Sequence, residues 1–414
     1  MILLVVALLQ SAAVAPPPAA AGEDQTIVVV GQRLSGTERA LAACIARGCP
    51  PKKEIAASLA HAENQFLVGD YAASRATLLK ARSRNEKYAK DIPVDVANLI
   101  RASGRLASLN GLSDSSRTNA IDSLDVLKGG LAHSDPRVLT ERLLVGDTFA
   151  KERRYTAAEE VYGTVAKQAN AAGLKQVEGL ALLRTAVLYT ALASVDSAYE
   201  YQARKAIRRI RDTTDPELAP FREATVTLER RVKSGDKAHD VEKAELAKTP
   251  SQQRTNEAVL VYASPIDLPD RSESGSKVVA VTGDPVPQWV DVTFMVRPDG
   301  TVQDIDVVRQ SDNVRGPWLD AVKASLAKRL YRPLAMAADK PGLRRIERYS
   351  LIYDVSYAPG SRVQARSSKP RVEMTDLTVE TPANLTDRHR RVSSCGDHAC
   401  GRSTRPQAPR SYCL

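Results

Sequence analysis

The chain has 414 residues, of which 43% are hydrophobic and 5% aromatic. This length allows two or three domains able to build packed cores, which excludes a chain that is disordered throughout, and the few aromatics favour helix over strand. The net charge of +10 and the pI near 9.3 predict a surface that attracts polyanions. Charge alone does not choose among nucleic acid, anionic lipid and acidic cell-wall polymers.

The N-terminus has the pattern of an export signal. Residues Ile2 to Leu9 are nearly all aliphatic, and alanine-rich sequence follows to Ala21. This stretch is too short for a membrane span, which needs about 20 residues. It fits a signal peptide over residues 1–21, although no Lys or Arg follows Met1. We therefore expect a periplasmic protein. The alternative is an uncleaved segment that anchors the chain in the inner membrane, facing the periplasm.

Two cysteines, Cys44 and Cys49, lie close together in the N-terminal segment 22–51. In an oxidising compartment this spacing predicts a small disulfide loop just before the first long helix; the alternative is two unrelated thiols. Cys395 and Cys400 lie near the C-terminus, where their spacing is too weak to predict a metal site.

Residues 52–233 have a helical pattern with few prolines. The turns Gly69-Asp70-Tyr71 and Arg153-Arg154-Tyr155 each separate two amphipathic runs. Small residues and aromatics that let paired helices approach closely stand at Gly146, Phe149, Ala158 and Tyr162. These positions resemble tetratricopeptide repeats, at a spacing of about 40 residues. The alternative is an ordinary helical bundle.

Residues 234–276 are polar and punctuated by prolines, which predicts a linker with a short helix near Val241 to Lys248. A period of two then appears in Val290 to Val296 and in Val302 to Val308, with the turn Pro298-Asp299-Gly300 between them. This pattern predicts a hairpin. The apolar stripe of a helix follows at Trp318, Val322, Leu326 and Leu330, and a third strand alternates at Tyr349, Leu351, Tyr353 and Val355.

This strand–strand–helix–strand order, with Tyr331-Arg332-Pro333 directly after the helix, resembles the C-terminal domain of TonB energy transducers. The likeness extends over residues 277–358. It implies that the third strand lies at a sheet edge and binds an extended peptide by strand addition, as TonB binds a segment of outer-membrane receptors. The alternative is a strand that serves only the core. The expected peptide-binding residues are Arg348, Tyr349, Ser350, Leu351, Ile352, Tyr353, Asp354 and Val355.

The segment Thr26 to Arg33 resembles the TonB box of TonB-dependent receptors. Because it is β-prone, it is suited to pairing with a sheet edge. Self-association, within one chain or between copies, is therefore a hypothesis, and a segment without a partner is the alternative.

No pattern for an enzyme, a cofactor or a metal is present: there is no HExxH, phosphate-binding loop, dinucleotide fingerprint or nucleophile elbow. Basic residues cluster at Lys205, Arg208, Arg209 and Arg211, and again at Arg344, Arg345 and Arg348. Export favours an anionic envelope surface such as peptidoglycan, or an acidic peptide, over nucleic acid as their partner, and a solvated face is the alternative.

The tail 359–414 is basic and poor in large apolar residues, so we expect it to be disordered. The sequence thus predicts an α+β multidomain protein, with an all-α tetratricopeptide-like array, a small β-β-α-β domain and this tail. The leading functional hypothesis is a periplasmic scaffold or adaptor that binds a protein or peptide, for example a segment of a TonB-dependent receptor. The alternative is a membrane-anchored transducer for outer-membrane transport.

Overall fold

The computed structural model describes residues 33–268, 279–280, 287–357, 364–367 and 369–378. The helices that form the array are α1 (Leu34–Ala46), α2 (Pro51–Leu67), α3 (Tyr71–Asn85), α4 (Pro93–Leu109), α5 (Ser113–Gly130), α6 (Pro136–Lys151), α7 (Tyr155–Ala171), α8 (Lys175–Ala193), α9 (Glu200–Arg211), α10 (Ala219–Ser234) and α11 (Ala238–Leu246). The later elements are β1 (Leu260–Tyr262), β2 (Val279–Ala280), β3 (Gln288–Val296), β4 (Val302–Gln310), α12 (Trp318–Ala327), β5 (Leu330–Tyr331), β6 (Leu343–Ile352), β7 (Val355–Tyr357), β8 (Gln364–Arg366) and β9 (Arg371–Asp376). A largely helical chain with a small antiparallel sheet confirms the α+β class.

The helices repeat as antiparallel pairs from α2/α3 to α10/α11. The turn inside each pair passes through Gly69, Gly111, Arg153 and Val195 at equal intervals of 42 residues (69 to 111, 111 to 153, 153 to 195). The first three of these residues have positive φ, the conformation that ends a helix tightly. The helix pairs therefore repeat every 42 residues over these four turns.

Local chemistry sets where the helices begin. Pro51, Pro93 and Pro136 open α2, α4 and α6, where the missing N–H would have no helical partner. The side chain of Asp70 accepts a hydrogen bond from the backbone N–H of Ala73 at 2.9 Å and so caps α3. The array thus starts each of its early pairs with a residue that fixes the helix boundary.

Buried polar contacts join neighbouring pairs in addition to the apolar core. Asp147 of α6 accepts hydrogen bonds from Tyr162 of α7 at 2.7 Å and from Arg184 of α8 at 2.9 Å. In α5, Ser123 donates to Glu141 of α6 at 2.6 Å. Because such groups are costly to bury unpaired, these contacts fix how one pair stacks on the next.

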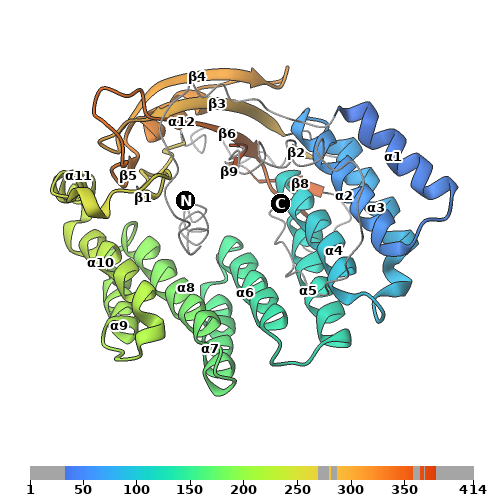
Figure 1. Cartoon of the computed structure of the whole chain (residues 1–414), viewed down its shortest axis with the longest axis horizontal. Helices are drawn as coiled ribbons and strands as arrows, with labels where there is room; N and C mark the ends of the chain where they lie inside the picture. The colour runs from blue at the N-terminus through green and yellow to red at the C-terminus, as the bar shows by residue number, and fades with distance from the viewer. Residues whose placement is uncertain (1–32, 269–278, 281–286, 358–363, 368, 379–414) are drawn as a thin grey trace, which may run out of the picture.

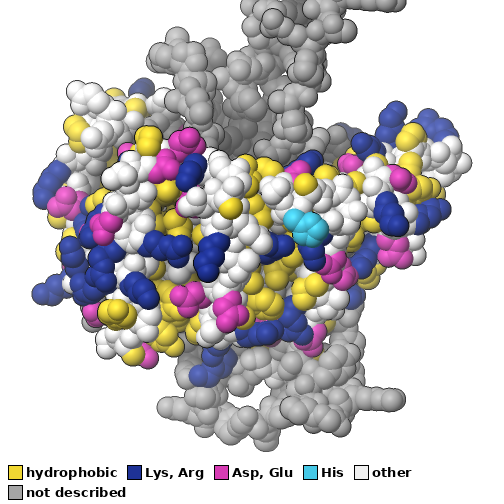
Figure 2. Space-filling model, turned by 90° about the horizontal axis from the view of Figure 1, so that it is seen from below, with side chains coloured by type: hydrophobic (Ala, Val, Ile, Leu, Met, Phe, Trp, Pro, Cys, Tyr) yellow, Lys and Arg dark blue, Asp and Glu magenta, His cyan; other side chains and the backbone are white. Residues whose placement is uncertain are grey.

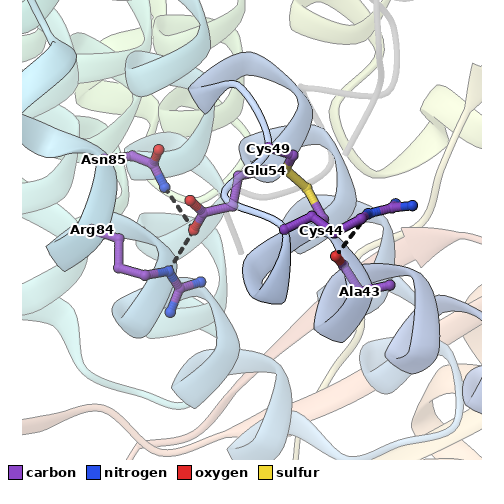
Figure 3. The surroundings of a disulfide bond; sticks show 7 residues. Ala43, Cys44, Cys49, Glu54, Arg84 and Asn85 are labelled. Carbon is purple, nitrogen blue, oxygen red and sulfur yellow. Dashed lines mark hydrogen bonds and ion pairs between the residues drawn. A yellow bond between two sulfur atoms is a disulfide. The ribbon is translucent and has the colours of Figure 1, made fainter.

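The predicted disulfide between Cys44 and Cys49 is confirmed. Figure 3 shows that it joins the end of α1 to the beginning of α2. The side chain of Glu54, one turn into α2, then pairs with Arg84 and accepts a hydrogen bond from Asn85 at 3.1 Å, both from the end of α3. The first three helices are therefore tied together at one end of the array.

The main sheet has four antiparallel strands in the order β4-β3-β6-β9. Its two faces are both covered. Val290, Val292 and Phe294 of β3 pack against α12, while Trp289 of the same strand packs into the core of α2 to α4. The described residues also form two smaller sheets, β1-β5 and β2-β8-β7. The main sheet thus contacts α12 through one face and α2 to α4 through the other, and it lies across the open side of the curved helical array (Figure 1).

Two predicted boundaries are wrong. The stretch 234–276, expected as a linker with a short helix near 241–248, has α11 near that place and also contains the strand β1. The tail from residue 359, expected to be disordered, supplies β8 and β9. The alternation of Val372 and Met374, both packed in the sheet core, is the signal for β9; it was missed because charged residues surround them. Among the described residues, no helix has the length and apolar character that crossing a membrane requires.

Candidate functional site

The predicted peptide-binding strand is not at an edge of the sheet. It is β6, which pairs with β3 on one side and with β9 on the other. Because both rows of backbone hydrogen-bonding groups are used, no place is left for an added strand. The prediction of a free edge at residues 348–355 is therefore wrong. The stretch 371–376, which the sequence analysis placed in the tail, occupies the position expected for a partner peptide.

Most of the predicted binding residues are buried rather than exposed. Arg348, Tyr349, Ser350, Leu351, Ile352 and Val355 are all at most 5% exposed. Tyr353 and Asp354 are half-buried where β6 gives way to β7. Along the strand, these side chains are buried alternately in the apolar core under α12 and in the contact between the sheet and the helical array. They form a seam that holds the sheet domain on the array.

Arg348 is the centre of this seam. Its guanidinium donates to Asp291 of β3 at 2.6 and 2.9 Å and to the carbonyl oxygen of Leu67, at the end of α2, at 2.8 Å. It also lies 4.0 Å from the ring centroid of Trp289, a cation–π distance. Burial opposes the charge, but the hydrogen bonds to Asp291 raise the pKa of Arg348 above its usual value. One buried ion pair therefore couples two strands to a helix end.

The turns of the first two repeats form the matching surface on the array. A Cβ on Gly69 would lie 2.2 Å from the ring of Trp289, and one on Gly111 would lie 2.3 Å from the carbonyl oxygen of Tyr353. The backbone N–H of Val355 donates to the carbonyl oxygen of Gly111 at 2.7 Å. Glycine is thus required at both turns for the sheet domain to approach.

A second polar contact locks β9 to the array. Glu373 accepts a hydrogen bond from Ser108 of α4 at 3.0 Å and pairs with Lys151, at the end of α6, at 3.5 Å. Arg371 donates to Asp354 at 2.9 Å and to the carbonyl oxygen of Ser108 at 2.8 Å. Burial raises the pKa of Glu373, but the charges of Lys151 and Arg371 outweigh it and hold the pKa at about 2.

A third buried cluster lies inside the sheet domain. Arg329 pairs with Glu347 at 2.7 Å and donates to the hydroxyl of Tyr349 at 2.7 Å. Burial raises the pKa of Tyr331 to about 12, so that this neighbouring phenol stays neutral. Because the charges face one another and are buried, the cluster holds the end of α12 to the sheet.

The other end of the array also contacts the sheet domain. Arg231 of α10 donates to the carbonyl oxygen of Val261 in β1 at 2.6 Å, and its guanidinium lies 5.4 Å from the ring centroid of Tyr262. Strand β1 in turn pairs with β5. The sheet domain therefore bridges the first and the last helix pairs of the array (Figure 1).

Several residues of the seam were missed in the sequence. Asp291 lies between Val290 and Val292, where a period of two predicts an exposed position. Arg371 and Glu373 lie in the tail expected to be disordered. The interval from Gly69 to Arg153 spans two repeats and could have indicated Gly111 at its midpoint.

Some predicted features lie outside the described residues. These are the signal peptide at 1–21, nearly all of the TonB-box-like segment and the cysteines of the tail. Within the part of the chain that the structure describes, no three His, Cys, Asp or Glu side chains lie together in a way that would hold a metal ion.

Comparisons with known proteins assign no family. No protein-family model matches the chain. No curated protein matches it either. A solved structure that does match is BtubC (BKLC) from P. vanneervenii, with 14% sequence identity and a TM-score of 0.38. The match covers 56% of this chain and 97% of that chain. At this TM-score, the similarity supports no conclusion about family, partner or activity.

Proposed function

We propose that the protein is an exported, protein-binding scaffold of the cell envelope, built from tetratricopeptide-like helix pairs and a TonB C-terminal-like domain. The observation that carries the proposal is the bridging of the helical array by the sheet domain, through Arg348 and Gly69 at one end and Arg231 at the other. Stacked helix pairs offer extended surfaces to other proteins, and a bridge across their ends fixes the curvature of such a surface. A scaffold needs a surface of this constant shape.

The same arrangement changes where strand addition is expected. The edge of β6 is closed, and β9 packs against α4. Strand β4 is the other outer strand of the sheet, and it pairs only with β3 among the described strands. Two register shifts interrupt β4, and Asp304 has a φ of +53°. Such bulges protect an edge, so we expect β4 to accept only a short strand from a partner.

Site-specific cross-linking in cells tests the proposal. A photoreactive residue replaces Val308, which is 55% exposed on β4, and the matched control replaces Lys340, which is exposed in the loop before β6. We expect a defined protein to cross-link from position 308 and not from position 340. The cross-linked peptide is then synthesised and titrated against the purified protein. The variant Val308→Lys, which places a charge on the edge, should weaken binding about tenfold.

The proposal also covers the helical surface, so two further positions complete the test. The exposed Leu79 of α3 and Ile121 of α5 receive the same photoreactive residue. Absence of any protein cross-link from positions 79, 121 and 308, in variants that keep the helical circular dichroism of the wild type, would refute a protein-binding scaffold.

A further inference from the structure

The outward face of α9 carries several exposed cations and an exposed tyrosine. Ala203, Ile207 and Ile210 are the buried residues of this helix. At 100° per residue, the opposite side of the helix is formed by Tyr201 and by three cations. We call these three the cationic stripe: Lys205, Arg208 and Arg209, all exposed.

The cationic stripe has no counterion among the described residues. The flanking arginines of α9 do: Arg204 pairs with Glu200 at 2.9 Å and Arg211 with Asp212 at 2.8 Å. The three side chains of the stripe make no ion pair or hydrogen bond with any described residue. Figure 2 shows Lys and Arg side chains gathered at the left of the face seen from below, toward the end of the array that holds α9. The stripe is therefore available to an external anion.

Exposed apolar side chains lie in the first turn of α9 and in the turn that precedes it. Tyr201 is 68% exposed and Val195, in the turn before α9, is 62% exposed; of the described large hydrophobic side chains, these two are the most exposed. The two residues are close in the sequence, Val195 before the helix and Tyr201 in its first turn. Tyrosine is favoured at the boundary between lipid headgroups and acyl chains, where its ring is buried and its hydroxyl stays wet. This pairing favours a lipid surface over nucleic acid or an acidic peptide.

We propose that the outward face of α9 docks the protein on an anionic lipid surface. The cationic stripe lies against the headgroup phosphates, while Tyr201 and Val195 insert at the headgroup level. The proposal is independent of which protein the scaffold binds, because α9 lies outside the seam and away from β4. It places the scaffold at a membrane without requiring a spanning helix.

Binding to vesicles by the full chain tests the proposal. The probes are vesicles of phosphatidylglycerol and vesicles of phosphatidylcholine, measured by flotation at low and high salt. The stripe variant is Lys205→Ser/Arg208→Ser/Arg209→Ser. The control is Lys52→Ser/Lys53→Ser/Lys80→Ser, which removes the same charge from exposed positions on α2 and α3. Thermal unfolding of both variants is recorded, because cations near a helix C-terminus also stabilise the helix.

We expect binding to phosphatidylglycerol that salt weakens and no binding to phosphatidylcholine. The stripe variant should lose about a hundredfold in affinity, at roughly fivefold per charge, while the control keeps the affinity of the wild type. Equal losses in the two variants, or no binding to phosphatidylglycerol, would overturn the proposal. Binding of duplex DNA that depends on the stripe, without vesicle binding, would assign the face to nucleic acid instead.

The aromatic contact has a separate readout. The Tyr201→Trp variant places a fluorophore on the face, against a background of the buried Trp289 and Trp318. Its emission should move to shorter wavelength with phosphatidylglycerol vesicles and stay unchanged with phosphatidylcholine. An emission that does not move while vesicles bind would show that Tyr201 stays in water, which contradicts insertion of this face.

Discussion

Single residues at the turns between paired helices decide how closely other parts of the chain can approach. Gly69 and Gly111 have positive φ and touch the sheet domain. Arg153 occupies the equivalent place in the third repeat, with a φ of +63°, and it is exposed. A side chain is tolerated there because the sheet domain does not cover this turn. The left-handed conformation still costs free energy for any residue with a Cβ.

Replacing Arg153 by glycine should therefore stabilise the protein. We expect Arg153→Gly to raise the free energy of unfolding by about 1 kcal/mol, because glycine adopts positive φ without strain. The control is Gly173→Ala in the turn after α7, where φ is +69° and a Cβ would meet nothing within 4 Å. That change should lower stability by about 1 kcal/mol for the same reason. Urea unfolding measures both, and a loss of stability in Arg153→Gly would contradict the argument.

At the scale of elements, β9 closes the edge of β6, and its contact with α4 depends on the carboxylate of Glu373. The pKa of Glu373 falls from about 4.5 in the unfolded chain to about 2 in the folded one. Its ionised form thus stabilises the fold fully above pH 4.5, and this contribution disappears as the pH falls from 4.5 to 2. A shift of this size corresponds to about 3 kcal/mol.

The variant Glu373→Gln tests this dependence. It should be less stable than the wild type at neutral pH, and the difference should shrink as the pH falls from about 4.5 toward 2. Chemical unfolding at a series of pH values measures it. The matched control is Glu217→Gln, which changes an exposed carboxylate remote from the sheet. A constant difference at all pH values would show that the charge of Glu373 does not hold β9.

Single helices and strands could be predicted from the sequence better than the contacts between them. The order of strands and helix from Val290 to Val355 follows from apolar periodicity, and the Cys44–Cys49 disulfide follows from spacing. The environment of β6 could not be read in the same way, because Arg348 and Asp291 look solvated until a second surface buries them. Periodicity shows whether a strand face is apolar or polar. It does not show that Asp291 and two carbonyl oxygens at the end of α2 satisfy the buried guanidinium of Arg348.

The strand β9 is a second element whose environment could not be predicted from the sequence. The strands β8 and β9 lie antiparallel to β7 and β6 respectively. Their polar composition predicted disorder, yet Arg371 and Glu373 become stable by pairing with Asp354, Ser108 and Lys151. A prediction of disorder from composition rests on the low content of apolar side chains. It therefore misses a strand that is held mainly by charged pairs and backbone hydrogen bonds.

At the scale of the whole molecule, the array and the sheet domain share their cores. Trp289 and Ile352 of the sheet belong to the apolar cluster of α2 to α4. Without the array, this apolar surface and the helix contacts of Arg348 would be exposed to water. The two parts should therefore fold and unfold together, although the sequence divides them into separate domains.

Comparison of fragments with the full chain tests this unity. The fragment 277–358, the domain expected from the sequence, lacks β1 and β9 and exposes the face that carries Arg348. We expect it to give poorly dispersed amide resonances and no cooperative thermal transition, while the full chain unfolds in one transition seen alike by helical circular dichroism and by tryptophan fluorescence. The fragment 255–380 restores both strands but not the array, and it should remain less stable than the full chain by several kcal/mol, because it exposes the apolar surface of Trp289 and Ile352 that the array buries. If the fragment 277–358 folds cooperatively alone, the sheet domain is an independent module, and the fixed curvature on which the scaffold depends is lost.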